Sequence, residues 1–112
     1  MHELSLCEAI AATVVRHAGD RTAAGVVVRI GYLRQVVPDA LSFCWSMLTE
    51  GTALDGCELE IEQVPAVIGC AGCGAETTLD VPLMICSACE GDDVNLLSGE
   101  EFQVVALELA EV

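Results

Sequence analysis

Positively charged residues are scarce in this chain. Its 112 residues contain four arginines and lysines against eighteen aspartates and glutamates, so the formal net charge at pH 7 is −14. A surface of this charge repels the phosphates of nucleic acids and anionic membrane headgroups, and we therefore expect neither as a binding partner. The same charge is compatible with metal cations or with a basic surface on a partner protein.

Long apolar runs are missing as well. No stretch reaches the length of a membrane-spanning helix, and the opening Met-His-Glu-Leu-Ser has neither the basic segment nor the apolar run of a secretory signal peptide. Seven cysteines are an odd number, which does not suit a set of paired disulfides. Together these features predict a reducing, cytoplasmic environment in which the thiols stay unpaired.

Four of the cysteines form a regular pattern in the second half of the chain. Two C-x-x-C motifs stand twelve residues apart, which is a spacing typical of a four-thiolate zinc site. Small residues inside each motif let the backbone curl around the sulfurs, and Gly74 and Gly91 can take the positive φ that such a knuckle often needs. We predict a structural zinc ion whose ligands are Cys70, Cys73, Cys86 and Cys89.

Two other interpretations of these cysteines compete with zinc. Disulfides need an oxidising compartment, and a redox C-x-x-C usually stands singly at the start of a helix. Four thiolates fill the coordination sphere of zinc and leave no position at which the metal could activate water. The cluster is therefore expected to fold its surroundings without catalysing a reaction, and we expect that the protein is not an enzyme.

Apolar periodicity predicts the secondary structure of the rest of the chain. Residues 4–18 and 38–48 show helical spacing, and we expect Phe43 and Trp45 of the second helix to lie in the core. Three further segments have the β-branched or alternating pattern of strands: residues 23–36, 57–64 and 102–109.

Shorter features refine this pattern. Gly31, inside the first strand segment, predicts a bulge or a close approach of two backbones. Residues 76–83, between the C-x-x-C motifs, are expected to fold back as a short two-stranded excursion. Residues 92–101 are expected to be a loop.

The order helix, strand, helix, strand, cysteine insertion, strand predicts an α+β fold. We expect a small three-stranded sheet covered by two helices, with an inserted four-cysteine zinc ribbon. Residues 1–66 and 100–112 would form the α+β domain, and residues 67–99 would form the zinc-ribbon domain.

The amino terminus offers a second set of metal-binding groups. The large His2 side chain should prevent removal of Met1, so that a free amine stays beside the imidazole. An amine, one or two deprotonated amide nitrogens and an imidazole suit a planar Ni(II) or Cu(II) better than a tetrahedral zinc. Glu3 supplies a carboxylate, as a ligand or as a hydrogen-bond acceptor for the imidazole. A histidine at position 2 is more often idle, so these residues alone leave the site open.

The combination of these features resembles one family. The M-H-E-L-S start, the G-Y-L at residues 31–33, the T-E-G-T at residues 49–52 and the doubled C-x-x-C are similar to the hydrogenase-maturation nickel chaperones of the HypA/HybF type. The resemblance covers the whole chain, and no motif position departs from the family pattern. Three extra thiols lie outside the motif, and we interpret them as small buried residues: Cys7, Cys44 and Cys57.

This resemblance implies that the α+β domain binds nickel and that the protein is a metallochaperone. His2 would be the principal Ni(II) ligand, assisted by the Met1 amine, and Glu3 would support the site or a partner contact. The resemblance also implies that the zinc is structural. The nickel would be cargo, passed with the help of a hydrogenase-maturation GTPase to the precursor of the [NiFe]-hydrogenase large subunit. In some relatives the same route serves urease, which implies urease maturation proteins as further partners.

Two other functions fit parts of the pattern. A zinc-ribbon adaptor for protein interactions would hold no second metal, and its His2 would be idle. A metalloenzyme or thiol-redox protein using one C-x-x-C is disfavoured, because all four thiolates are engaged in a closed site. The carrier and the adaptor differ at residues 1–3, which are therefore the residues to test.

Overall fold

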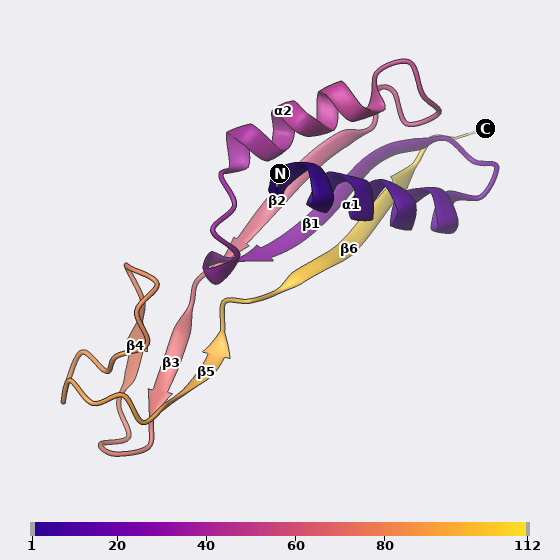
Figure 1. The fold of residues 1–112 in the computed structure, drawn as a ribbon. Coiled ribbons are helices and arrows are strands. Elements are labelled where there is room, and N and C mark those ends of the chain that lie inside the picture. The colour runs from indigo at the N-terminus through magenta and orange to yellow at the C-terminus, as the bar shows by residue number, and fades with distance from the viewer. Residues whose placement is uncertain (1, 112) are drawn as a thin grey trace. The chain divides into compact units, whose positions relative to one another are not determined.

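Figure 1 shows the computed structural model of the chain, which describes residues 2–111 and, of His2, the backbone only. Its elements are α1 (His2–Ala18), β1 (Ala23–Gly31), the 3-10 helix η1 (Tyr32–Arg34), α2 (Pro38–Thr49), β2 (Glu58–Val64), β3 (Val67–Cys70), β4 (Glu76–Thr78), β5 (Val94–Ser98) and β6 (Phe102–Leu109).

The chain divides into two compact units, which are described in turn. Unit 1 comprises Met1–Arg29, Val36–Glu62 and Gln103–Val112. Unit 2 comprises Ile30–Gln35 and Gln63–Phe102.

Unit 1 is built on a three-stranded sheet in the order β2-β1-β6. β1 and β2 run in the same direction and β6 runs opposite to them, so the sheet is mixed (Figure 1). The amide of Ala110 donates to the carbonyl of Thr22 at 2.8 Å, which continues the antiparallel pairing beyond the last residue of β6. α2 connects the two parallel strands, as a parallel pair requires a crossover of this kind.

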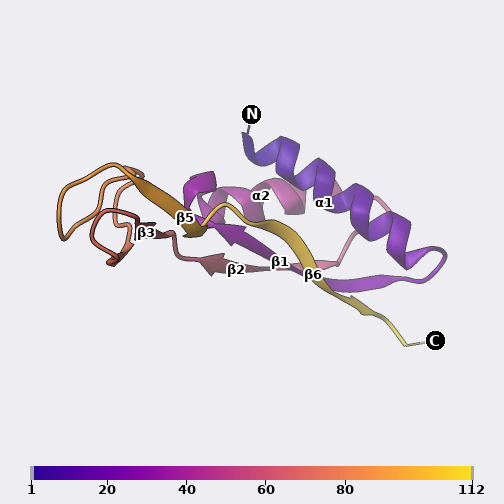
Figure 2. The same ribbon diagram turned by 90° about the horizontal axis from the view of Figure 1, so that it is seen from below.

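Both helices cover the same face of this sheet (Figure 2). The buried stripe of α1 and the inward side chains of β1 and α2 form the core, whose members are Leu6, Ile10, Val14, Val26, Val28, Leu41 and Trp45. Trp45 also donates its indole N–H to the carbonyl oxygen of Cys57 at 2.7 Å, which ties α2 to the residue before β2. The core is thus closed at that end by a hydrogen bond as well as by packing.

The predicted α+β architecture is confirmed, with one correction to a strand bound and one to a predicted core residue. The strand predicted over residues 23–36 is shorter, because the chain turns into η1 after Gly31 and Gln35 takes a left-handed conformation with φ 54°. The core prediction is correct for Trp45, which is 3% exposed, and wrong for Phe43, which is 68% exposed. Residues two apart on a helix point to different sides, so only one of these two rings can face the sheet.

Unit 2 contains a second sheet, in which β3 pairs antiparallel with both β4 and β5 in the order β4-β3-β5. Its small core consists of Ala66, Ile68 and Leu79, with partly buried side chains packed around them. Tyr32 of η1 is one of these, and its hydroxyl donates to the carbonyl oxygen of Asp80 at 2.9 Å. The segment 30–35 therefore belongs to the packing of this unit.

Two details of the predicted ribbon are wrong. Residues 76–83 contain a single short strand, β4 (Glu76–Thr78), and not a two-stranded excursion. Residues 92–101, predicted as a loop, contain β5, because Val94 and Leu96 alternate inward onto the core around Ile68. Two acidic residues and an asparagine near the start of this segment hide its alternation in the sequence.

A close approach of two backbones occurs at Gly31, as predicted. A Cβ atom at this position would overlap the carbonyl group of Gly99 and the amide nitrogen of Glu100. The approach is held by hydrogen bonds on both sides, from the Gly31 amide to the Glu101 carbonyl at 2.8 Å and from the Leu33 amide to the Gly99 carbonyl at 2.7 Å. No side chain can fit here without moving one of the two segments.

We expect Gly31→Ala to lower the free energy of unfolding by about 3 kcal/mol, since the added methyl meets backbone atoms that cannot rotate away. Urea unfolding followed by circular dichroism, with zinc present in excess, would measure the change.

Gly69→Ala is the matched control, because its Cβ would meet only the flexible end of Leu97, at 3.5 Å. This substitution should cost less than about 1 kcal/mol. Equal effects of the two substitutions would contradict the close approach at Gly31.

Candidate metal centre

The four predicted zinc ligands come together in unit 2. Their sulfur atoms all lie within 4.8 Å of one another. The closest pairs join the two motifs, with 3.6 Å between the Cys70 and Cys89 sulfurs and 3.6 Å between those of Cys73 and Cys86. Cys70 and Cys86 are buried, whereas Cys73 and Cys89 are exposed. The cluster therefore sits at the surface, with the first cysteine of each motif on its inner side.

The two motifs have the same backbone geometry. In the first, the Cys70 amide donates to the Ala75 carbonyl and the Gly74 amide donates back to the Cys70 carbonyl, both at 2.9 Å. In the second, the Cys86 amide donates to the Gly91 carbonyl and the Glu90 amide donates back to the Cys86 carbonyl, again at 2.9 Å. Each motif is therefore a closed knuckle that aims its two sulfurs the same way.

The positive φ falls at the same position of both knuckles, directly after the second cysteine, but on a different type of residue in each. Gly74 takes φ +78°, as predicted, but in the second knuckle Glu90 takes φ +61° and Gly91 has no positive φ. Gly91 has a different role, since a Cβ there would lie 3.2 Å from the Cys89 sulfur. A left-handed conformation is strained for glutamate, so the second knuckle is held in place by its surroundings.

Backbone amides around the sulfurs change the thiol pKa values. The amides of Cys89 and Ala88 donate to the Cys86 sulfur and lower its pKa to about 6. The amide of Ala75 lowers the pKa of Cys73, but hydrogen bonds with the Cys86 and Cys70 sulfurs raise it to about 12. The two pKa values move in opposite directions because neighbouring thiolates repel one another. One sulfur therefore stays protonated and donates a hydrogen bond to the other, which is the thiolate. A divalent cation would replace such protons, and its binding would strengthen as pH rises.

The arrangement fits a zinc ion. A tetrahedron with Zn–S bonds of about 2.3 Å has sulfur–sulfur edges of about 3.8 Å. The observed spacings of 3.6 Å, with the remaining pairs within 4.8 Å, are close to this value. Four soft thiolates in this geometry select zinc over harder cations. The cluster is thus consistent with a zinc site.

Sequence reasoning missed the residues that hold the two knuckles together. The Ser87 amide donates to the hydroxyl oxygen of Thr77 on β4 at 3.1 Å. The Ala71 amide of the first knuckle donates to the carbonyl of Asp93, just beyond the second, at 2.9 Å. These contacts join residues ten or more positions apart, and no local pattern in the sequence points to them.

Two of the three residues proposed for the second metal, His2 and Glu3, begin α1. Met1 and the His2 side chain lie outside the described part of the structure, and the backbone of His2 begins the helix. Glu3 is in the first turn and is partly buried. A carboxylate there also interacts favourably with the amide groups at the helix start.

The three extra thiols belong to unit 1, whereas the four-sulfur cluster belongs to unit 2. Cys7 and Cys57 are buried and Cys44 is partly buried. Burial, with smaller effects of Cys44 and Glu3, raises the pKa of Cys7 to about 11, and its sulfur contacts the Leu41 carbonyl at 3.5 Å. The interpretation as small buried side chains therefore holds for Cys7 and Cys57 and in part for Cys44.

Comparisons with known proteins agree with the fold and the cluster. A family model described as "Hydrogenase/urease nickel incorporation, metallochaperone, hypA" matches residues 1–109. The hydrogenase maturation factor HypA of Geotalea uraniireducens (strain Rf4) is 42% identical over 109 residues, which cover 97% of this chain and 99% of that protein. The hydrogenase maturation factor HypA of Chloroflexus aurantiacus is 43% identical, covering 96% and 98%.

A solved structure has the same fold. The solution structure of the Ni metallochaperone HypA from Helicobacter pylori superimposes with a TM-score of 0.67 over 97% of each chain, at 21% sequence identity.

The fold and the site define an α+β metal-binding protein with a separate, zinc-ribbon-like unit. The chain belongs to the HypA family of nickel metallochaperones for hydrogenase maturation, which are carriers and not enzymes. Within residues 2–111, no helix is long and apolar enough to pass through a bilayer.

We expect Glu90→Gly to raise the free energy of unfolding of the zinc-loaded protein by about 1 kcal/mol, because glycine adopts the positive φ without strain. Gly74→Ala should have the opposite effect of similar size. Urea unfolding with zinc in excess measures both.

Glu90→Gln is the control that removes the negative charge near the thiolates and keeps the strained conformation. If Glu90→Gln stabilised the protein as much as Glu90→Gly, electrostatic repulsion and not backbone strain would explain the gain.

Proposed function

We propose that the chain binds Ni(II) at its amino terminus as cargo for the hydrogenase large subunit. His2 is the principal ligand, the Met1 amine and the backbone nitrogen next to it complete the nitrogen set, and Glu3 supports the imidazole or a partner contact. The observation that carries this proposal is the family match over residues 1–109, since it includes the amino terminus itself. An amine and an imidazole are the donors that planar Ni(II) favours.

We propose further that Cys70, Cys73, Cys86 and Cys89 bind a structural zinc ion. Their mutual spacing supports this assignment, and a closed thiolate site retains its metal. The two metals are then separated by the chemistry of their ligands, with sulfur for the resident zinc and nitrogen for the transported nickel. A metal in a shallow site at a chain end can pass to an acceptor by exchange of ligands. A metal held by four thiolates on two rigid knuckles is not released readily.

The partners that follow are a hydrogenase-maturation GTPase and the precursor of the [NiFe]-hydrogenase large subunit. The family description includes urease, so urease maturation proteins are candidate partners as well. We propose a cytoplasmic location, because unpaired thiols need a reducing environment. The alternative, an adaptor with zinc alone, is separated from the carrier by nickel binding at residues 1–3.

We expect His2→Ala to weaken Ni(II) binding at least about tenfold, which is typical of losing one metal-binding imidazole or its support. An extension left before Met1 should also weaken it, since the terminal amine becomes an amide. Titration calorimetry with Ni(II) on protein with an unmodified amino terminus measures these losses, and metal analysis should find the zinc content unchanged.

His17→Ala is the matched control, because His17 is the other histidine of the chain and lies on the exposed face of α1, with Nδ1 2.9 Å from the Thr13 carbonyl oxygen. This variant should bind nickel like the native protein. Nickel affinity that is the same in native protein, His2→Ala and the extended protein would place the site elsewhere and favour the adaptor.

Cys73→Ser should lose bound zinc and unfold unit 2, since the small core of that unit depends on the metal. Cys44→Ser, a thiol outside the cluster, should keep one zinc per chain. Metal analysis by mass spectrometry reports the stoichiometry, and retention of stoichiometric zinc in Cys73→Ser would contradict the four-cysteine assignment.

A further inference from the structure

One edge of the unit 1 sheet is open. In the order β2-β1-β6, β2 is an outer strand, and within residues 2–111 it pairs with β1 alone. The other side of β2 therefore carries backbone N–H and C=O groups that no strand uses. Such an edge is a ready template for a further strand.

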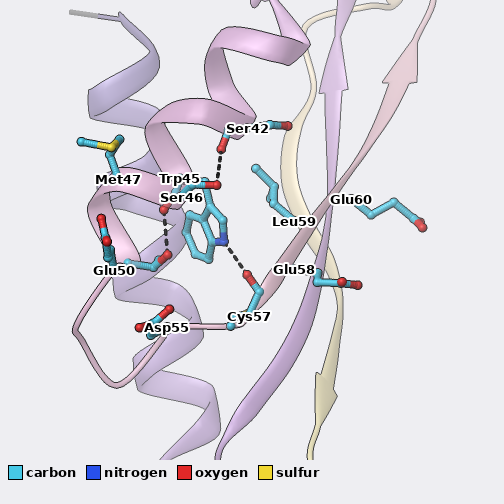
Figure 3. Close-up of a pocket in the computed structure, with 12 residues that line it drawn as sticks. Ser42, Trp45, Ser46, Met47, Glu50, Asp55, Cys57, Glu58, Leu59 and Glu60 are labelled. Atoms are coloured by element: carbon cyan, nitrogen blue, oxygen red, sulfur yellow. Dashed lines mark hydrogen bonds between the residues drawn. The ribbon is translucent and has the colours of Figure 1, made fainter.

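A groove runs beside this edge, between the second half of α2 and β2 (Figure 3). Its volume is about 910 Å³, which is room for several side chains and not only for an ion or a water molecule. The α2 side presents the short hydroxyl side chains of Ser42 and Ser46, while Trp45 and Leu59 form an apolar floor. The short side chains leave the edge of β2 accessible beneath the helix.

The groove is lined by acidic groups and by no basic residue. Glu50 and Asp55 lie at its α2 side, and Glu58 and Glu60 of β2 lie along it with side chains that point away from α2 (Figure 3). The nearby Glu62 is neutralised by Arg29, whose guanidinium lies 2.9 Å from its carboxylate oxygen, so the charge that remains uncompensated is at the groove end of β2. Opposite charge on a partner would be attracted to this end of the strand.

Large apolar side chains stand on the adjoining surface of α2. Met47 lines the groove and is 60% exposed, and Phe43, one turn before it, is 68% exposed. Neither the Phe43 ring nor the Met47 thioether packs in the core described above. Exposed apolar residues rimmed by charge are typical of a protein-binding surface.

We propose that the β2 edge and its groove bind an extended segment of a partner protein in which apolar residues alternate with arginine or lysine. The segment adds to β2 as a further strand. Its apolar side chains face α2 and rest against Leu59 and Trp45, while its basic side chains face the opposite side of the sheet, toward Glu58 and Glu60. This alternation follows from β2 itself, whose residues point by turns toward the helices and away from them.

The charge of the groove argues against a second copy of this chain as the occupant. Two β2 edges would bring the same glutamates together, in a protein whose net charge is −14. The site is separate from residues 1–3 and from the four cysteines, so its test does not depend on nickel or zinc binding.

The test uses the zinc-loaded full chain and a fluorescein-labelled peptide of sequence RVKLRVK, with the composition-matched peptide VVLRRKK as a reference. Fluorescence anisotropy should show the alternating peptide binding about tenfold more tightly, as only it can place one kind of side chain on each face. Amide hydrogen exchange should slow at residues 58–62, and the emission of Trp45, the single tryptophan, should shift.

Two charge variants locate the binding. Glu58→Gln with Glu60→Gln should weaken binding of the alternating peptide about tenfold, because two exposed charge pairs are lost. Glu8→Gln with Asp20→Asn removes the same charge from exposed residues of α1 and of the turn after it, outside the groove lining, and should change the affinity less than about twofold. Ser46→Leu, which fills the groove from an exposed position, should abolish the slowed exchange.

Three results would overturn the proposal. Equal binding of the two peptides, or equal loss in the two double variants, would mean attraction by net charge alone. Slowed exchange at residues 58–62 that increases with protein concentration without peptide would identify a second copy as the occupant. Aggregation of the Glu58→Gln, Glu60→Gln protein with no peptide binding by the native chain would mean that these glutamates only protect the edge from self-association.

Discussion

The convergence of four cysteine sulfurs is the constraint on which unit 2 depends. The buried core of this unit consists of Ala66, Ile68 and Leu79, which is too little apolar surface to order, by itself, the whole of Ile30–Gln35 and Gln63–Phe102. The two knuckles are held by matched backbone hydrogen bonds, and their amides lower the pKa of Cys86 to about 6. The proposed zinc ion would add the free energy that the core lacks, since metal binding and folding are one equilibrium in such units.

Unit 1 is organised differently, because its stability comes from packing. Two helices cover one face of the sheet, and their contact with it buries large side chains such as Ile10, Leu41 and Trp45. A folded unit of this kind keeps α1 rigid and carries Glu3 in the first turn of that helix. The proposed nickel site is therefore attached to a rigid helix, while its ligands at the chain end can exchange. A metal carrier needs both properties.

The pairing of the strands decides where some of the excess acidic residues lie in the fold. Along the sequence, Glu58, Glu60 and Glu62 are simply the polar half of an alternating strand. In the fold, Glu62 is engaged by Arg29, while Glu58 and Glu60 border a groove next to an unpaired strand edge. Charge that looks uniform in composition is thus concentrated where a basic partner could use it.

The sequence alone determined the α+β class, the bounds of β6, the two helices to within two residues, and the four cysteines, because periodicity and ligand spacing are local properties. Two features depended on the tertiary structure. β5 forms only because Val94 and Leu96 have Ile68 to pack against, and Phe43 is exposed because the sheet lies on the Trp45 side of α2. The positive φ of Glu90 is instead a local property, since Glu90, like Gly74, directly follows the second cysteine of its motif. Contacts between distant residues decided β5 and the exposure of Phe43, and such contacts leave no local signal in the sequence.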